Sequence, residues 1–167
     1  MKKNIFYLHL ICLCLFIIPH NVFCQSTEKE PTNETYLIKN ADFETGTMDG
    51  WKHWRTRYSS IVKDAYSGNY AVKIGPERAF CNQEFKVKGN ALYQLSAFVK
   101  TESGAEEIQM IISNYGGAAK SVTSSLTAYS KVTLDFQTAY SIDTMMISFV
   151  HPSGAGSAYV DQIELLY

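Results

Sequence analysis

The residues best suited to chemistry in this sequence are a few carboxylates within segments that are otherwise apolar or turn-forming. Glu44 follows Phe43, Asp64 precedes a Ser-Gly turn, and Asp161 follows Val160 close to the end of the chain. Carboxylate oxygens are the ligands of hard cations such as Ca²⁺, which takes about six to eight oxygens. Carboxylates in turns can equally be solvated, and the residue types alone leave both interpretations open.

The sequence carries no recognisable catalytic motif. It has no Gly-x-Ser-x-Gly elbow, no His-Glu-x-x-His zinc motif and no phosphate-binding glycine loop. After the first 24 residues the only histidines are His53 and His151, so a histidine-based active site would depend on one of these two. Glycoside hydrolysis would need two carboxylates about 5 to 9.5 Å apart across a cleft, and the carboxylates named above are better suited to a cation. We therefore expect a protein that is not an enzyme.

Residues 1–24 have the organisation of a secretory signal peptide. Lys2 and Lys3 precede an apolar run that Pro19 ends. The run is shorter than the roughly 20 residues of a membrane-spanning helix, so no transmembrane span is predicted. Cleavage after Cys24 would give a secreted, periplasmic or cell-surface protein. Lipoprotein anchoring through Cys24 is the alternative, although Phe23 is larger than the residue that such sites usually place before the cysteine.

The rest of the chain is predicted to form one domain after a short linker. Residues 25–35 contain no large apolar side chain and are expected to be flexible, which leaves residues 36–167 for the domain. Loss of Lys2 and Lys3 from 15 basic residues, against 16 acidic ones, makes residues 25–167 mildly acidic and gives no indication of nucleic-acid binding. This part of the chain retains only Cys81, which we expect to be buried in the core rather than reactive.

The domain is predicted to consist almost entirely of β-strands. Short segments rich in Tyr, Phe, Val, Ile and Thr recur between Gly, Ser, Asn and Asp clusters, without apolar residues at helical spacing. Tyr93, Leu95, Ala97 and Val99 alternate with their neighbours, as in a strand with one buried face. About ten strands with this spacing favour an all-β, two-sheet antiparallel β-sandwich of jelly-roll type. The predicted strands are residues 36–40, 51–58, 69–74, 79–87, 91–100, 107–114, 119–125, 130–138, 144–151 and 157–166.

Five segments in order resemble the jelly-roll carbohydrate-binding modules of families 4, 9 and 22, which are attached to bacterial xylanases and glucanases. The segments are NADFETG at 40–46 followed by Gly50-Trp51, DAYSGNYAVKI at 64–74, YQLSAFVK at 93–100, YSKVTLDF at 129–136 and AYVDQIEL at 158–165. The resemblance covers residues 36–167 and implies a galactose-binding-domain-like sandwich. Related sandwiches also act as spacers and docking domains, so the fold alone does not determine function.

This resemblance implies a structural calcium site. In such modules the ion ties the N-terminal segment to the last strand, away from the sugar. Here Glu44, Asp64 and Asp161 would provide side-chain oxygens, and Asp42 and Ser67 would provide backbone carbonyls. The implied role is stability, not catalysis.

The resemblance also implies a sugar-binding sheet face. Sugars have apolar C–H faces edged with hydroxyls, so such a face needs exposed rings and nearby polar side chains. Trp51 matches a buried tryptophan of these modules, whereas Trp54 lies on the opposite strand face, either exposed or covered by a loop. In the segment 78–83, Phe80 stands in place of a tryptophan of the family, and Gln83 reaches the same face only through a bulge or at a strand end. The candidate sugar-contacting residues are Trp54, Tyr58, Phe80, Gln83, Asn114, Tyr115 and His151.

Two functions are consistent with these features. The first is a non-catalytic module that binds a poly- or oligosaccharide, alone or together with a glycan-degrading enzyme or a surface complex. The second is an adhesion or scaffold domain that keeps the sandwich and the calcium site and docks a protein partner without binding sugar. Tyr115 and His151 have a structural alternative as loop and turn residues.

Overall fold

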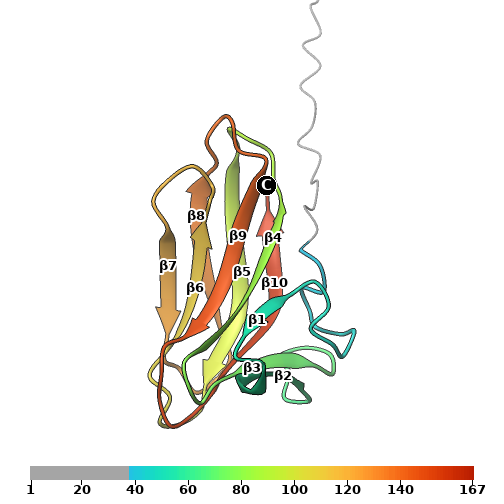
Figure 1. Ribbon diagram of the computed structural model, residues 1–167, viewed down its shortest axis with the longest axis vertical. Coiled ribbons are helices and arrows are strands. Elements are labelled where there is room, and N and C mark those ends of the chain that lie inside the picture. The colour runs from blue at the N-terminus through green and yellow to red at the C-terminus, as the bar shows by residue number, and fades with distance from the viewer. Residues whose placement is uncertain (1–37) are drawn as a thin grey trace, which may run out of the picture. The chain divides into compact units, whose positions relative to one another are not determined.

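The computed structural model describes residues 38–167, so the predicted signal peptide and linker lie outside the described residues. Ten strands form two five-stranded antiparallel sheets (Figure 1). The first sheet has the order β1-β4-β9-β6-β7 and the second β2-β3-β10-β5-β8. The predicted two-sheet β-sandwich is thereby confirmed. The strands are β1 Lys52–Trp54, β2 Ser59–Val62, β3 Ala71–Ile74, β4 Ala79–Lys86, β5 Leu92–Thr101, β6 Ile108–Ser113, β7 Lys120–Ser124, β8 Ser130–Gln137, β9 Thr144–His151 and β10 Ala158–Leu166.

The hydrophobic core lies between the sheets and follows the alternation of the strands. In β5, Tyr93, Leu95, Ala97 and Val99 are buried as predicted, each at most 3% exposed. Cys81 of β4 is also fully buried, and this burial raises the pKa of its thiol to about 12, so the expected inert core cysteine is confirmed.

Trp51 anchors the N-terminal segment in this core. Its ring is 5% exposed and lies 5.5 Å from the ring of Phe43 and 6.0 Å from that of Phe149, between ring centroids. The indole Nε1 donates to the Asn40 carbonyl at 3.2 Å. The predicted buried tryptophan is therefore confirmed.

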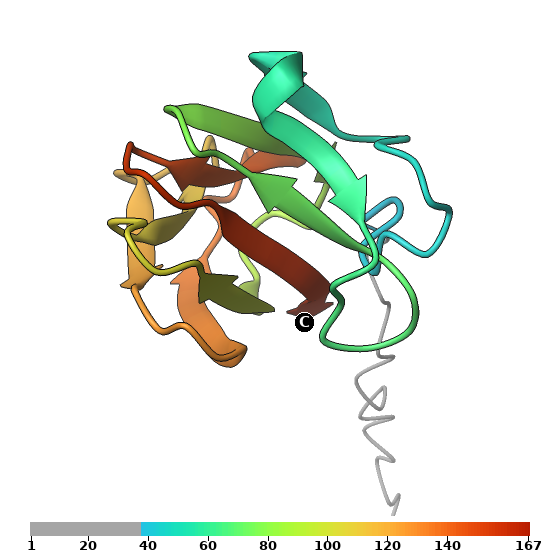
Figure 2. The ribbon, with the colours of Figure 1, turned by 90° about the horizontal axis from the view of Figure 1, so that it is seen from below.

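Two of the predicted strands are wrong at the start of the domain. Of the predicted strand 36–40, residues 36 and 37 lie outside the described residues, while Lys39 and Asn40 form a turn, with Asn40 in the left-handed region at φ 48°. The predicted strand 51–58 breaks at Arg55, where φ is 57°, and the 3-10 helix η1 (Thr56–Tyr58) follows. Beyond η1 the chain enters β2 of the other sheet, a strand that the sequence pattern had not predicted (Figure 2). A left-handed residue redirects the backbone, and period-two alternation cannot reveal this.

The backbone of the N-terminal segment is held against the sandwich by hydrogen bonds with β4 and β10. The Gln83 side chain accepts from the Lys39 amide at 2.7 Å and donates to the Lys39 carbonyl at 2.9 Å. The Ile163 amide of β10 donates to the Ala41 carbonyl at 2.9 Å. Within residues 38–167, no helix is long and apolar enough to span a membrane.

Candidate functional site

The outer face of the first sheet presents a row of side chains across all five strands. Strand register places Trp54, Phe80, Val150, Gln109 and Thr123 side by side. All five are at least partly exposed, because they alternate with the inward-facing residues of the same strands. The row therefore combines two rings and an aliphatic side chain with an amide and a hydroxyl.

Trp54 and Phe80 form an aromatic pair at the β1 end of this row. Their centroids are 5.6 Å apart and their planes differ by 14°, an offset-stacked arrangement. The Arg55 guanidinium lies 4.6 Å from the Trp54 ring centroid and also pairs with Glu77 at 3.6 Å. Trp54 is nevertheless 44% exposed. The pair is thus held in place by its neighbours while remaining open to a ligand.

A second row beside the first is mainly polar. Asn82 on β4 lies next to Ser148 on β9, and Lys52 and Ser121 lie at the two edges of the sheet. Asn82, Ser148 and Gln109 of the first row were not among the predicted sugar contacts. Their signal is the strand phase, since each occupies a position opposite to a buried neighbour.

Two sequence-predicted sugar contacts face the core instead. Gln83 is 4% exposed and binds the Lys39 backbone, while His151 has no exposed surface. The His151 ring nitrogens lie 3.1 Å from the Glu107 carbonyl (Nδ1) and 3.2 Å from the Pro76 carbonyl (Nε2). The predictions for Gln83 and His151 are therefore wrong. Gln83 shares the phase of Cys81, and His151 shares that of buried Phe149.

The remaining candidates lie away from the aromatic pair. Tyr115 is 6% exposed, donates its hydroxyl to the Ala118 carbonyl and packs edge-on against Phe136, so it is a structural residue and its prediction is wrong. Asn114 is exposed in the turn after β6, with φ 62°. Tyr58 belongs to η1, and its hydroxyl accepts from Arg57 Nη2 at 2.6 Å. Trp54 and Phe80 are the two candidates that the fold brings together.

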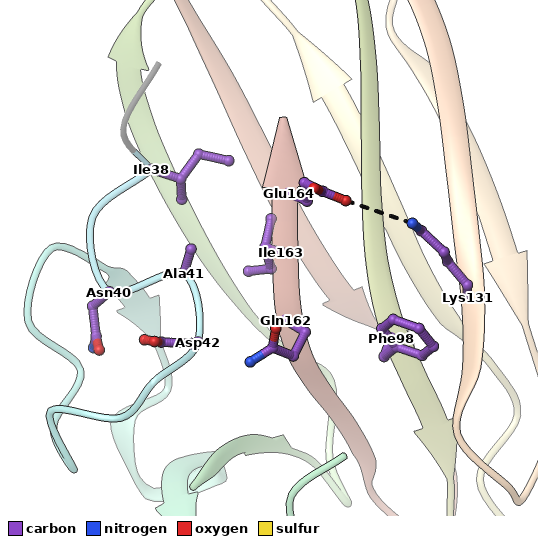
Figure 3. Close-up of a pocket in the computed structure, with 9 residues that line it drawn as sticks. All are labelled: Ile38, Asn40, Ala41, Asp42, Phe98, Lys131, Gln162, Ile163 and Glu164. Carbon is purple, nitrogen blue, oxygen red and sulfur yellow. Dashed lines mark ion pairs between the residues drawn. The ribbon is translucent and has the colours of Figure 1, made fainter. Parts of the chain in front are cut away.

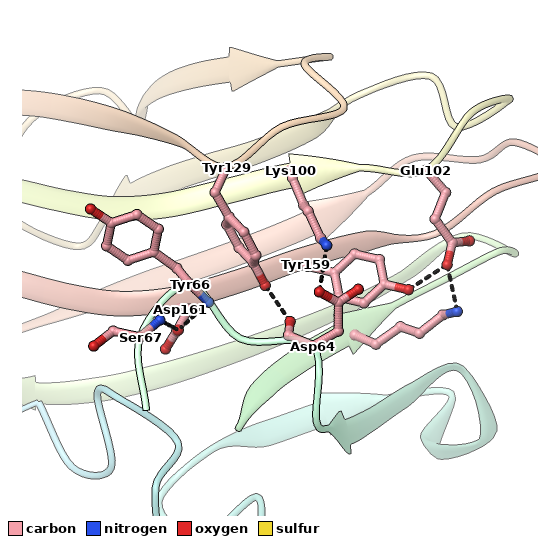
Figure 4. Close-up of polar contacts among 9 residues, drawn as sticks. Asp64, Tyr66, Ser67, Lys100, Glu102, Tyr129, Tyr159 and Asp161 are labelled. Atoms are coloured by element: carbon pink, nitrogen blue, oxygen red, sulfur yellow. Dashed lines mark hydrogen bonds and ion pairs between the residues drawn. The ribbon is translucent and has the colours of Figure 1, made fainter. Parts of the chain in front are cut away.

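The predicted metal ligands Glu44 and Asp161 both accept hydrogen bonds from the β2–β3 loop. Asp161 has no exposed surface, and its Oδ2 accepts from the amides of Tyr66 at 2.9 Å and Ser67 at 3.0 Å (Figure 4). Burial raises the pKa of Asp161, although these amide donors lower it in part. Glu44 Oε1 accepts from the amides of Asn69 and Tyr70, both at 2.8 Å, and these bonds lower the pKa of Glu44.

The predicted calcium ligands fit a metal ion only in part. Asp64 pairs with Lys100 Nζ at 2.6 Å instead of joining the other carboxylates. Asp42 Oδ1 accepts from the Glu44 amide at 3.2 Å. Among the described residues, no group of three or more His, Cys, Asp or Glu side chains is arranged to hold a metal. Glu44 Oε2 and Asp161 Oδ1 each accept one hydrogen bond within residues 38–167, so each retains a lone pair.

A separate carboxylate, Glu102, binds side chains of β3 and β10 on the outer face of the second sheet (Figure 4). Its Oε1 accepts from Lys73 Nζ at 2.7 Å and from the Tyr159 hydroxyl, and its Oε2 accepts from the Ser157 amide at 2.9 Å. Burial raises the pKa of Glu102, but these donors outweigh it and lower the pKa to about 2.

We expect acid to destabilise the protein through Glu102. Because the folded-state pKa of about 2 lies below the ordinary value of 4.5, the unfolded chain takes up the proton first. The stabilisation is therefore complete above about pH 5 and is lost as the pH falls toward about 2. Urea unfolding across this range should show a smaller pH dependence for Glu102→Gln than for the unaltered protein. Equal pH dependence in the two proteins would contradict the assignment.

Comparisons with known proteins agree with this architecture. The family model described as a carbohydrate binding domain, CBM_4_9, matches residues 35–154. No curated protein matches the chain. TmCBM61, solved with β-1,4-galactotriose, is 24% identical, with a TM-score of 0.65 and coverage of 78% of this chain and 97% of that one.

Two further solved structures share the fold. A family 16 carbohydrate-binding module is 24% identical, with a TM-score of 0.68 and coverage of 78% of this chain and 99% of its own. The CBM22-1 xylan-binding domain of Xyn10C from Paenibacillus barcinonensis is 14% identical, with a TM-score of 0.58 and coverage of 75% and 90%. Because the family model matches most of the 167 residues, this chain belongs to the carbohydrate binding domain family CBM_4_9.

Proposed function

We propose that this protein is a non-catalytic module that binds a poly- or oligosaccharide on the outer face of the first sheet. The observation that carries the proposal is the Trp54–Phe80 pair, which stays partly exposed on a sheet face that carries polar side chains beside the aliphatic Val150 and Ile111. Stacked rings supply apolar surface for sugar C–H groups. Asn82, Gln109 and Ser148, on the neighbouring strands, supply amide and hydroxyl groups that can bond the sugar hydroxyls.

Family membership supports a carbohydrate ligand for this chain. The similar structure TmCBM61 holds a galactotriose, and the similar CBM22-1 domain is described as xylan-binding. We also propose that the chain is exported, on the basis of the signal-peptide pattern in residues 1–24. Export would bring the binding face to extracellular or cell-surface glycans.

Affinity electrophoresis against a panel of plant, fungal and host polysaccharides tests the proposal. Retardation of the protein by one glycan class, and its strong reduction in Phe80→Ala, is the expected result. Leu92→Ala is the matched control, because Leu92 is 72% exposed on the second sheet and its removal should leave retardation unchanged. A folded protein that no glycan retards would contradict the proposal and favour a scaffold domain that docks a protein.

We further propose that Ca²⁺ binds through the free lone pairs of Glu44 and Asp161, with backbone carbonyls near Asp42 and Ser67 completing the ligand set. This ligand set leaves out Asp64, because its Oδ1 pairs with Lys100 Nζ at 2.6 Å. Calcium at about 100 times its Kd would then stabilise the fold by about 2.7 kcal/mol.

Thermal melts with calcium and with a chelator test this ligand set. Calcium is expected to raise the Tm of the unaltered protein and of Asp64→Asn. It should raise the Tm of Glu44→Gln much less, because the amide has no charge to offer the cation. A Tm that chelation leaves unchanged would contradict calcium binding, and loss of the effect in Asp64→Asn would contradict the reduced ligand set.

A further inference from the structure

A hollow lies on the opposite side of the sandwich from the Trp54–Phe80 face, between the N-terminal segment and the outer face of the second sheet. Its volume is about 500 Å³, within the usual range of about 300 to 1,000 Å³ for small-molecule sites. Figure 3 shows the segment with Asn40 and Asp42 on one side of this hollow and the strands β10, β5 and β8 on the other. The strands contribute Gln162, Glu164, Phe98 and Lys131.

A β-bulge in β10 directs Gln162 toward this hollow. The pairing of β10 with β5 shifts between Asp161 and Glu164, and Gln162 has a left-handed φ of 47°. A bulge changes the direction of a side chain relative to the regular pleat. Figure 3 shows the Gln162 side chain extending from β10 toward Asp42 of the N-terminal segment. The fold therefore places an amide, which can both donate and accept, at the centre of the hollow.

The other lining groups complement this amide. Lys131 and Glu164 form an ion pair with a long separation of 3.6 Å, and their side chains are 46% and 53% exposed. Such an exposed pair is weak, so both groups can bond a ligand at small cost. Phe98 forms an apolar wall that Tyr66 holds rigid, because their rings are parallel within 8° and 3.6 Å apart between centroids.

We propose that this hollow is a second saccharide site, which holds one or two residues of a neutral sugar. An apolar wall beside an amide, an ammonium and carboxylates matches the alternating C–H faces and hydroxyls of a pyranose. Asp42 and Glu164 outnumber Lys131, so the hollow disfavours uronic acids and other anions. Because this site and the Trp54–Phe80 face belong to different sheets, one protein could hold two glycan chains at once, and such bivalent contact increases retention on a polysaccharide.

Nuclear magnetic resonance titration of the ¹⁵N-labelled protein with neutral methyl glycosides and short oligosaccharides tests the second site. Millimolar sugar is expected to shift the backbone signals of Gln162, Glu164 and Lys131 and the side-chain amide signal of Gln162. These shifts should persist in Phe80→Ala, which disables the first face. The titration therefore tests the second site independently of the function proposed above.

Two substitutions of Gln162 distinguish an effect on binding that comes from loss of the amide from one that comes from a disturbed backbone. Gln162→Gly keeps the left-handed backbone and removes the amide, and it should weaken the binding that these signals report about three- to tenfold, the effect of one neutral hydrogen bond. Gln162→Asn, which also tolerates this backbone and keeps an amide, should bind more tightly than the glycine variant. The proposal would be overturned if no neutral sugar shifts the signals of residues 162–164. It would also be overturned if the sugar shifts these signals equally in Gln162→Gly and in the unaltered protein.

Discussion

Replacement of Phe80 by alanine is expected to weaken glycan binding about thirtyfold while the fold remains intact. Phe80 is half-buried on the outer face of the first sheet, between Trp54 on β1 and Val150 on β9. Removing a ring at the centre of a binding surface typically costs about 2 kcal/mol, which corresponds to this factor. Isothermal titration with the glycan identified by electrophoresis would measure it.

Trp54→Ala should reduce affinity to a similar extent, because the two rings form one stacked unit. The two losses should not add in the double variant, since each single change already disrupts the pair. Leu92→Ala on the second sheet serves as the control for general surface effects. Unchanged affinity in both Phe80→Ala and Trp54→Ala would exclude this face as the glycan-binding site.

Trp51→Ala is expected to lower the free energy of unfolding by about 3 to 5 kcal/mol, the usual cost of truncating a buried aromatic residue. Trp51 packs against Phe43 and Phe149, and its indole is the donor to the Asn40 carbonyl. Folded domains have a total stability of only about 5 to 15 kcal/mol. The variant should therefore unfold at a much lower urea concentration.

Trp54→Ala is the matched control for this measurement, since it removes the same side chain three residues away. Trp54 is 44% exposed and Trp51 is 5% exposed, so the control should lose much less stability. Trp51→Phe should lie between the two because it retains part of the ring packing. Equal urea midpoints for Trp51→Ala and Trp54→Ala would contradict the assignment of Trp51 to the core.

The sequence determined the fold class and the separation of the two tryptophans. Regular alternation in residues 93–99 identifies one buried face, and the structure buries those same residues. Trp51 and Trp54 are an odd number of residues apart in an extended segment, which places them on opposite faces. Cys81, as a lone cysteine, was likewise predicted to be buried. The first two inferences depend on local residue spacing and the third on the number of cysteines, and the sequence contains both directly.

Only the tertiary structure decided which groups meet across the sheets and loops. The left-handed Arg55 ends β1 and redirects the chain into the other sheet, so Tyr58 leaves the face that Trp54 occupies. Gln83 turned out to bind the Lys39 backbone, and Asp64 to pair with Lys100. The partners in these pairs are 44 and 36 residues apart in the chain. The physical reason is that a polar side chain takes whichever partner the packed chain brings within hydrogen-bonding distance, and local residue spacing does not specify that partner.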